Sequence, residues 1–253
     1  MQLNTVTRSL LRSGELREYL KKSPVKGRVE GVASSSFPLI IAAVQSMDPR
    51  QTLVVTRNAQ KMHDLAVDLG CFLEPHQVVT LSPLETLPYE FVSPPEKILR
   101  ERVSALYCLL SGEPCVCVAT VESIMRSVPN REFLLRKGIT LTTGEDYPFD
   151  DIAETLVSYG YTREYRVESY GQFSVKGGIL DIFLSARESP VRLDFFGDTL
   201  DSIREFDIES QISYRRIDAI TIYPRRELIL SKSERAALLS RIDEAIERGL
   251  DIP

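Results

Sequence analysis

The sequence predicts an α/β fold in which a parallel sheet carries an inserted, mainly antiparallel α+β domain. Between residues 28 and 122, short apolar strands alternate with amphipathic helices, as in a parallel sheet covered on both faces. Within 138–204, apolar and polar residues alternate along short segments separated by turn residues, as in an antiparallel sheet with one solvated face. The apolar run at 219–224 is expected to return to the parallel sheet, which makes the smaller unit an insertion.

The elements of the parallel sheet are expected from residue 28 onward, after a helical lead-in. Apolar runs predict its strands at 28–32, 52–56, 77–82 and 115–121. Amphipathic spacing predicts a helix after Ser36, a second with Asn58 as its N-cap, and a third that ends before Gly112. A further helix is expected at 122–128.

The second unit is expected to begin with a strand at 138–144 and a helix at 150–160. Alternating strands follow at 163–169, 177–183, 191–197 and 200–207. The last predicted element is an amphipathic helix within 233–253. These elements divide the chain into a helical lead-in at 1–27, an α/β domain at 28–137 plus 205–224, an inserted domain at 138–204, and the start of a further, truncated domain at 225–253.

The composition is that of an ordinary globular protein, with 43% apolar and 26% charged residues among 253. A net charge of −5 argues against a chain whose main task is to neutralise phosphates and favours a protein partner. The longest apolar runs are far shorter than the roughly 20 residues needed to cross a bilayer. We therefore expect a cytoplasmic protein with no membrane partner.

The cysteines and histidines do not predict a metal site. The chain has four cysteines and two histidines, without a C-x-x-C or H-E-x-x-H spacing. Cysteine is among the residues most often buried, so reduced core thiols are the favoured interpretation. No metal, cofactor or catalytic residue is predicted.

The stretch that opens the helix after Ser36 has the position of a phosphate loop but not its chemistry. Such a loop needs glycines that expose backbone N–H groups, a Lys that neutralises the phosphates, and a hydroxyl that holds Mg²⁺. Here only Gly31 and the serines Ser34, Ser35 and Ser36 remain. Ordinary helix initiation, with Ser36 as N-cap and Pro38 in the first turn, is favoured over phosphate binding.

Three long segments resemble a known family. The segment 81–112, with "ETLPYE", "SPPEK" and "RERVSALYCLL", is similar to the N-terminal region of the bacterial transcription-repair coupling factor, Mfd. The segments 165–183 and 190–207 resemble the same factor and also UvrB, a component of the bacterial excinuclease. In UvrB these strands form the domain that binds UvrA, another component of the excinuclease. The resemblance covers roughly residues 28–225 and implies a role in nucleotide excision repair.

The resemblance also implies what this chain lacks. UvrB keeps a complete phosphate loop and a Tyr-rich hairpin that opens DNA, whereas the coupling factor's N-terminal module keeps neither. The chain therefore resembles a degenerate, P-loop-type helicase-like scaffold that binds UvrA and is not itself an enzyme. In the full-length family, separate motor domains hydrolyse ATP, translocate on DNA and push stalled RNA polymerase; the contacts with DNA and polymerase are expected only through those absent domains.

Residue by residue, the resemblance places the UvrA contact on Arg192 and Phe196, with Lys176 where the family usually has Arg. Strand alternation alone puts Arg192, Asp194 and Phe196 on one face, where an Arg beside an aromatic has the composition of a binding hot spot. The plainer interpretation is that Arg192 pairs with Asp194 or with a carboxylate across the sheet. Asp181 and Asp194 are expected to form ion pairs rather than to catalyse.

Two rival functions remain open at this point. One is a nucleotide- or DNA-binding NTPase component of the UvrB type, which uses the loop at Gly31 and the serines despite the missing Lys. The other is a DNA-binding module that works through a local basic surface in spite of the acidic total charge.

Overall fold

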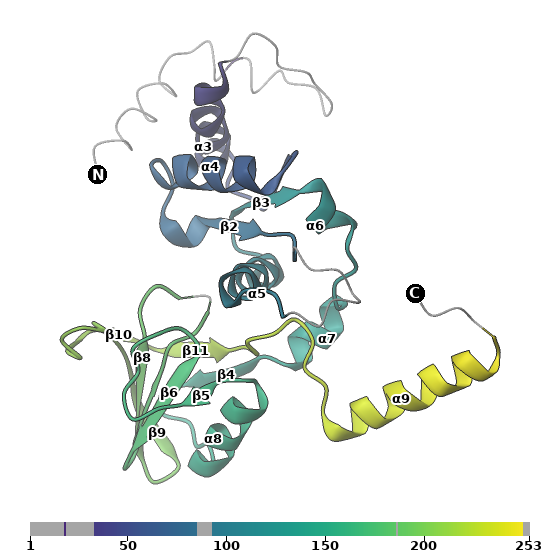
Figure 1. Cartoon of the computed structure of the whole chain (residues 1–253). Helices are drawn as coiled ribbons and strands as arrows, with labels where there is room; N and C mark the ends of the chain where they lie inside the picture. Colours follow the sequence, from purple (N-terminus) through teal and green to yellow (C-terminus); the bar gives the residue numbers. More distant parts are fainter. Residues whose placement is uncertain (1–17, 19–32, 85–92, 186, 250–253) are drawn as a thin grey trace.

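The chain is seen in a computed structural model that describes residues 18, 33–84, 93–185 and 187–249. Its described part contains two units, one built on a parallel sheet and the other on a larger, mainly antiparallel sheet, and a helix that extends away from both (Figure 1). The expected strand at 28–32 and nearly all of the expected lead-in at 1–27 lie outside the described residues.

The first unit is built on three parallel strands in the order β1-β3-β2. Helices pack on both faces of this sheet, as the sequence pattern predicts, and every residue of the central strand is buried. Its elements, in chain order, are η1 (Ser34–Ser36), α3 (Phe37–Met47), β1 (Thr52–Thr56), α4 (Ala59–Gly70), η2 (Pro75–Gln77), β2 (Val78–Leu81), α5 (Glu96–Ser111), β3 (Val116–Thr120), α6 (Val121–Met125) and α7 (Arg131–Arg136).

Alternate residues of β3 belong to two different cores. Val116 and Val118 pack with α3 and α4, while Cys117 and Ala119 pack with α5 and α7. The helix ends also follow the sequence signals. The Asn58 side chain accepts a hydrogen bond from the Lys61 backbone N–H at 2.9 Å, and Gly112 ends α5 with a positive φ of 76°.

The second unit is a six-stranded sheet in the order β10-β9-β8-β7-β6-β5, beside a two-stranded sheet of β4 and β11. All its neighbouring strands run antiparallel except β5 and β6. Its elements are β4 (Ile139–Thr142), α8 (Phe149–Ser158), β5 (Thr162–Arg163), β6 (Gln172–Lys176), β7 (Ile179–Ile182), β8 (Val191–Phe196), β9 (Thr199–Phe206), β10 (Ser213–Ile217) and β11 (Ala219–Ile222).

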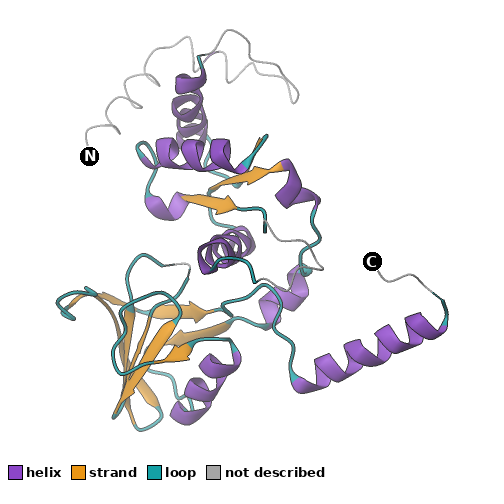
Figure 2. Ribbon diagram, in the orientation of Figure 1, coloured by secondary structure: helices purple, strands orange, loops and turns teal. Residues whose placement is uncertain are grey.

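One face of the six-stranded sheet is closed by α8 and by the β4–β11 pair, as the single helix beside the sheet in Figure 2 shows. Ile152 and Leu156 of α8 enter the same core as Leu180, Leu193 and Ile203 of the central strands. On the other face, called the open face below, Lys176 and Phe196 are exposed, whereas Asp181, Ser202 and Phe206 are buried. This face is therefore only partly solvated, because a small apolar cluster that includes Val167 packs on Phe206.

Several expected elements differ from the structure. The run at 219–224 does not return to the parallel sheet: β11 pairs antiparallel with β4, Ile220 opposite Leu141. β9 crosses the expected boundary at 204, and β10 extends the same sheet to Ile217. Of the strand expected at 163–169, only Arg163 is in a strand, because the following residues form a loop. β6, β10 and α7 were not expected.

The two units are joined by a buried ion pair. Arg102 of α5 has no exposed surface, and its guanidinium binds both carboxylate oxygens of Glu227, which follows β11. A third bond runs from Nη1 of Arg102 to the Ser82 carbonyl oxygen at 2.7 Å. These three bonds connect the end of β2, the middle of α5 and the segment that leaves the second unit.

The described residues contain neither a membrane-spanning helix nor a cluster of metal ligands. Among them, no helix is long and apolar enough to cross a membrane, and no three His, Cys, Asp or Glu side chains gather as metal ligands would. Cys115 and Cys117 are buried as expected, and burial raises the pKa of Cys117 to about 12. Cys71, however, is exposed, because it follows the last turn of α4.

The last helix, α9 (Lys232–Glu247), is the helix expected within 233–253, and it begins with a capping box. The Ser231 hydroxyl accepts from the Glu234 backbone N–H, and the Glu234 carboxylate accepts from the Ser231 backbone N–H. None of its residues is buried, and an ion pair between Lys137 and Glu234 at 2.8 Å ties its first turn to α7.

We predict that Arg102→Met destabilises the chain by about 3 kcal/mol or more, because it leaves the Glu227 carboxylate largely buried without its partner. Urea unfolding followed by circular dichroism measures this loss. The matched control is Lys97→Met on the same helix: the Lys97 side chain is exposed, and its long contact with Glu101 at 3.7 Å should contribute about 0–1 kcal/mol. Equal midpoints for the two variants would contradict the role assigned to Arg102.

Candidate partner-binding face of the six-stranded sheet

The open face of the six-stranded sheet carries the residues that the sequence singled out. In β8, Val191, Leu193 and Phe195 are buried, whereas Arg192 and Asp194 are half-buried and Phe196 is exposed. This alternation places Arg192 and Phe196 on the face away from α8, as predicted. Both lie on one continuous strand, so their spacing is fixed by the backbone.

Lys176 lies on the same face, at the end of β6. It is opposite Ile179 of β7, which is opposite Asp194 of β8, and residues paired across strands point to one side. Two strand spacings separate β6 from β8, which is about 10 Å, and Phe196 is four residues from Arg192, about 13 Å. The structure therefore places Lys176, Arg192 and Phe196 on one patch of the open face, small enough for a single partner protein to contact all three.

Arg192 is held in place by Asp181 on the neighbouring strand. Its Nε and Nη2 donate to the two carboxylate oxygens at 2.7 and 2.9 Å, and its guanidinium carbon lies 4.8 Å from the centre of the Phe206 ring. The hydrogen bonds from Arg192 to Asp181 raise the pKa of Arg192 above its ordinary value. With 22% of its side chain exposed, Arg192 presents an oriented charge rather than a flexible one.

Phe196 has the opposite character, with 87% of its surface exposed. It is the last residue of β8 and is paired with Thr199 across the turn at Gly197, which has a positive φ of 63°. No described aromatic ring contacts it, although Phe195 beside it packs on Phe149 in the core. The ring therefore offers apolar area for a partner to bury.

Lys176 contacts an exposed aromatic that the sequence reasoning missed. Its Nζ lies 4.3 Å from the centre of the Tyr165 ring, which is 86% exposed. The sequence offered a weak signal for this residue, since Tyr165 falls in the segment that resembles the UvrA-binding strands. Tyr165 adds a second exposed ring to the patch, on a loop instead of the expected strand.

The charges on this face are largely paired within the sheet. Arg204 of β9 lies opposite Arg192 and donates to Asp194 at 2.7 Å. Each of these two facing arginines is therefore paired with a carboxylate of its own, which offsets the repulsion between them. Arg166, on the loop after β5, donates to the backbone carbonyls of Ile208 and Glu209. The expectation that Asp181 and Asp194 form ion pairs is confirmed.

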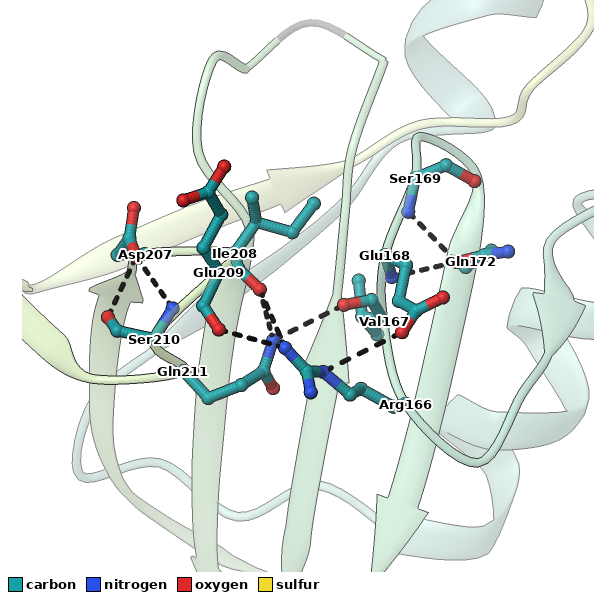
Figure 3. A network of polar contacts seen from close by, with 10 residues as sticks. All are labelled: Arg166, Val167, Glu168, Ser169, Gln172, Asp207, Ile208, Glu209, Ser210 and Gln211. Atoms are coloured by element: carbon teal, nitrogen blue, oxygen red, sulfur yellow. Dashed lines mark hydrogen bonds and ion pairs between the residues drawn. The ribbon is translucent and has the colours of Figure 1, made fainter.

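A polar network lies at one end of the face, where the loops 164–171 and 207–212 meet (Figure 3). The Gln211 amide donates to the carbonyl oxygens of Ile208 and Val167, and the Asp207 carboxylate accepts from both the backbone and the hydroxyl of Ser210. The backbone carbonyl of Gln211 then accepts from Arg192 at 3.4 Å. The network therefore holds in place the carbonyl oxygen of Gln211, which accepts a hydrogen bond from the Arg192 guanidinium.

The serines that the sequence placed in a degenerate phosphate loop lie in the other unit, away from this face. Ser34, Ser35 and Ser36 form the 3₁₀ turn η1 ahead of α3, in the other unit, and Gly31 lies outside the described residues (Figure 1). Ser36 is the residue before the helix and Pro38 is in its first turn, as expected, but the Ser36 hydroxyl makes no capping bond. The "ETLPYE" segment at 85–90, one of those that carry the family resemblance, also lies outside the described residues.

Comparison with known proteins places the second unit in a described family. Residues 139–228 match the "UvrB interaction domain", and this range contains every strand of the open face. Transcription-repair-coupling factors are similar over most of the chain. That of Bacillus subtilis is 30% identical over 93% of this chain and 20% of its own length, that of Escherichia coli 33% over 70% and 15%, and that of Mycobacterium tuberculosis 37% over 81% and 17%.

The chain spans a fifth or less of these relatives. The matched range begins at β4 and ends just beyond β11, so it coincides with the second unit of the structure. It also includes Glu227, the partner of the buried Arg102. The chain belongs among the UvrB-like modules of the bacterial transcription-repair-coupling factors.

Proposed function

We propose that this chain binds UvrA of the bacterial excinuclease through the face that carries Lys176, Arg192 and Phe196. The observation that carries the proposal is the match of the UvrB interaction domain to the residues that build this face. The exposure of Phe196 and Tyr165 supports it, because large rings on a rigid sheet give contact area at low cost in conformational entropy.

The proposal extends to the role of the whole protein. In a transcription-repair-coupling factor, a UvrA-binding module recruits UvrA to RNA polymerase stalled at a lesion, in the cytoplasm. The module itself is a non-catalytic, helicase-like scaffold whose nucleotide site has degenerated, and contacts with DNA and polymerase belong to other parts of the protein. The missing Lys at Ser34–Ser36 supports this division of labour.

We predict that Phe196→Ala weakens UvrA binding by roughly thirtyfold, since a desolvated aromatic hot spot contributes about 2 kcal/mol. Surface plasmon resonance with immobilised UvrA measures the dissociation constant. The matched control is Phe37→Ala, which removes a partly exposed ring from α3 in the other unit and should bind like the parent. Parent-like binding by Phe196→Ala would place the recognition surface elsewhere.

Arg192→Ala is expected to weaken binding to a similar degree. This change also leaves the Asp181 carboxylate unpaired, so its thermal midpoint must be measured alongside. A fall in affinity at a temperature where the variant is fully folded assigns the guanidinium to the contact. A loss of affinity that only accompanies unfolding would remove Arg192 from the binding site.

We predict that Lys176→Arg binds UvrA as tightly as the parent or more tightly. A guanidinium keeps the stacking on Tyr165 and adds a fork that can form two parallel bonds with a carboxylate. Lys176→Met, of similar length without the charge, is the control and should bind more weakly. Weaker binding by the Arg variant than by the Met variant would show that no carboxylate faces this position.

We predict that the chain has no Mg²⁺-dependent ATPase activity above background, because the loop has no Lys and motor carboxylates and arginine fingers are supplied by domains outside this sequence. A coupled phosphate-release assay measures this activity, with and without duplex DNA. Turnover that persists in a variant with Ser34, Ser35 and Ser36 all changed to Ala would indicate a contaminant. Turnover abolished by that change would favour the NTPase alternative.

A further inference from the structure

We infer that the junction between the two units holds a binding site for a phosphate or pyrophosphate group. A cavity of about 310 Å³ opens there, between the first turns of α5 and the loops of the second unit. Four of its lining residues are cationic: Lys97, Arg100, Arg225 and Arg226. This site is separate from the open face of the sheet and from the serines of η1.

Arg225 forms the rigid wall of the cavity. Its Nη1 donates to the Gly160 carbonyl oxygen at 3.0 Å and its Nη2 to the Glu96 carboxylate at 3.0 Å, and its side chain is only 19% exposed. The guanidinium lies against Gly171, where a Cβ atom would come within 2.1 Å of Nε. Gly171 therefore leaves room for the arginine, and the charge is held at the cavity rather than moving freely in solvent.

Arg100 is oriented from the opposite wall. Its guanidinium carbon lies 4.1 Å above the centre of the Tyr170 ring, and Tyr170 in turn lies on Phe183, with ring centres 4.0 Å apart. Stacking fixes the plane of a guanidinium while leaving its edge N–H groups free to donate. Two planar cations on rigid supports thus line one cavity.

The charge of the cavity is not balanced by the described residues. Neither Arg100 nor Arg226 is within ion-pair distance of a carboxylate in that part of the chain, and Lys97 is 3.7 Å from Glu101 on its outer side. Glu96, which pairs with Arg225, is the sole acidic residue among those that line the cavity. Cations gathered in one hollow raise the local positive potential, which an anion relieves.

A phosphoryl group fits this arrangement better than a carboxylate. It has three or more oxygens and up to two negative charges, and arginine forks bind such groups with paired hydrogen bonds. The hydroxyl groups of Ser169 and Ser185, which also line the cavity, supply neutral donors. A volume near 310 Å³ holds a diphosphate comfortably but not a duplex, so the source is a free polyphosphate or one backbone phosphate of a nucleic acid at the opening.

The test is isothermal titration of the whole chain with inorganic pyrophosphate at constant ionic strength. We expect saturable binding that Arg100→Gln and Arg226→Gln each weaken and that the two changes together weaken at least tenfold. Neither arginine has an ion pair to lose among the described residues, so the thermal midpoints without ligand should stay close to that of the parent. The matched control is Arg241→Gln on the exposed helix α9, which should bind like the parent.

A second arm uses a short single-stranded DNA, with and without pyrophosphate as competitor. DNA binding that pyrophosphate displaces and the double variant loses assigns the site to a backbone phosphate; pyrophosphate binding without DNA binding assigns it to a free polyphosphate. The proposal is overturned if the parent binds neither ligand, or if the double variant binds as well as the parent, since the anion would then be held elsewhere, including at the serines of η1.

Discussion

The arrangement of the two units depends on one buried cation, the guanidinium of Arg102. A guanidinium with no exposed surface is tolerated only when its charge and its donors are satisfied, because removing a charge from water costs several kcal/mol. Glu227 supplies the charge and Ser82 a carbonyl oxygen. Both partners must therefore stay beside α5, and the segment that follows β11 cannot drift from the parallel sheet without exposing or orphaning the pair.

Apolar contacts reinforce the same junction. Tyr223, just after β11, stacks on Tyr107 of α5 with ring centres 3.7 Å apart, and the absence of a Cβ atom at Gly138 leaves space for that ring. The ion pair fixes how the segment after β11 is oriented on α5, and the two stacked rings bury apolar area between the same two elements. Together they fix the residues between Tyr223 and Glu227, which include two of the three arginines of the cavity, Arg225 and Arg226. An anion bound there would therefore act on a junction that is already preorganised.

Sequence reasoning was reliable where local signals decide the outcome. The alternation in β8, the cap at Asn58 and the glycine after α5 all follow from the nearest few residues. It was wrong where partners distant in sequence decide: β11 has the apolar pattern of a strand in either sheet, and only its register with β4 assigns it. The segment 163–169 alternates like a strand, with apolar Tyr165 and Val167 two residues apart, but in the loop only Val167 enters a small core and Tyr165 is exposed. The plainer interpretation of Arg192, a pair with a carboxylate across the sheet, is confirmed, but the choice of Asp181 depends on the cross-strand register and could not be read from the sequence.

The pairing within the open face determines what kind of partner suits it. Arg192 and Arg204 are neutralised by Asp181 and Asp194, so the face is not a strongly basic patch and does not select a polyanion. A partner instead gains most by covering Phe196 and by offering acidic groups that share the donors already oriented on the strands. Because those donors are held before binding, the complex loses little side-chain entropy in forming, and specificity follows from matching a fixed pattern of charge around an exposed ring.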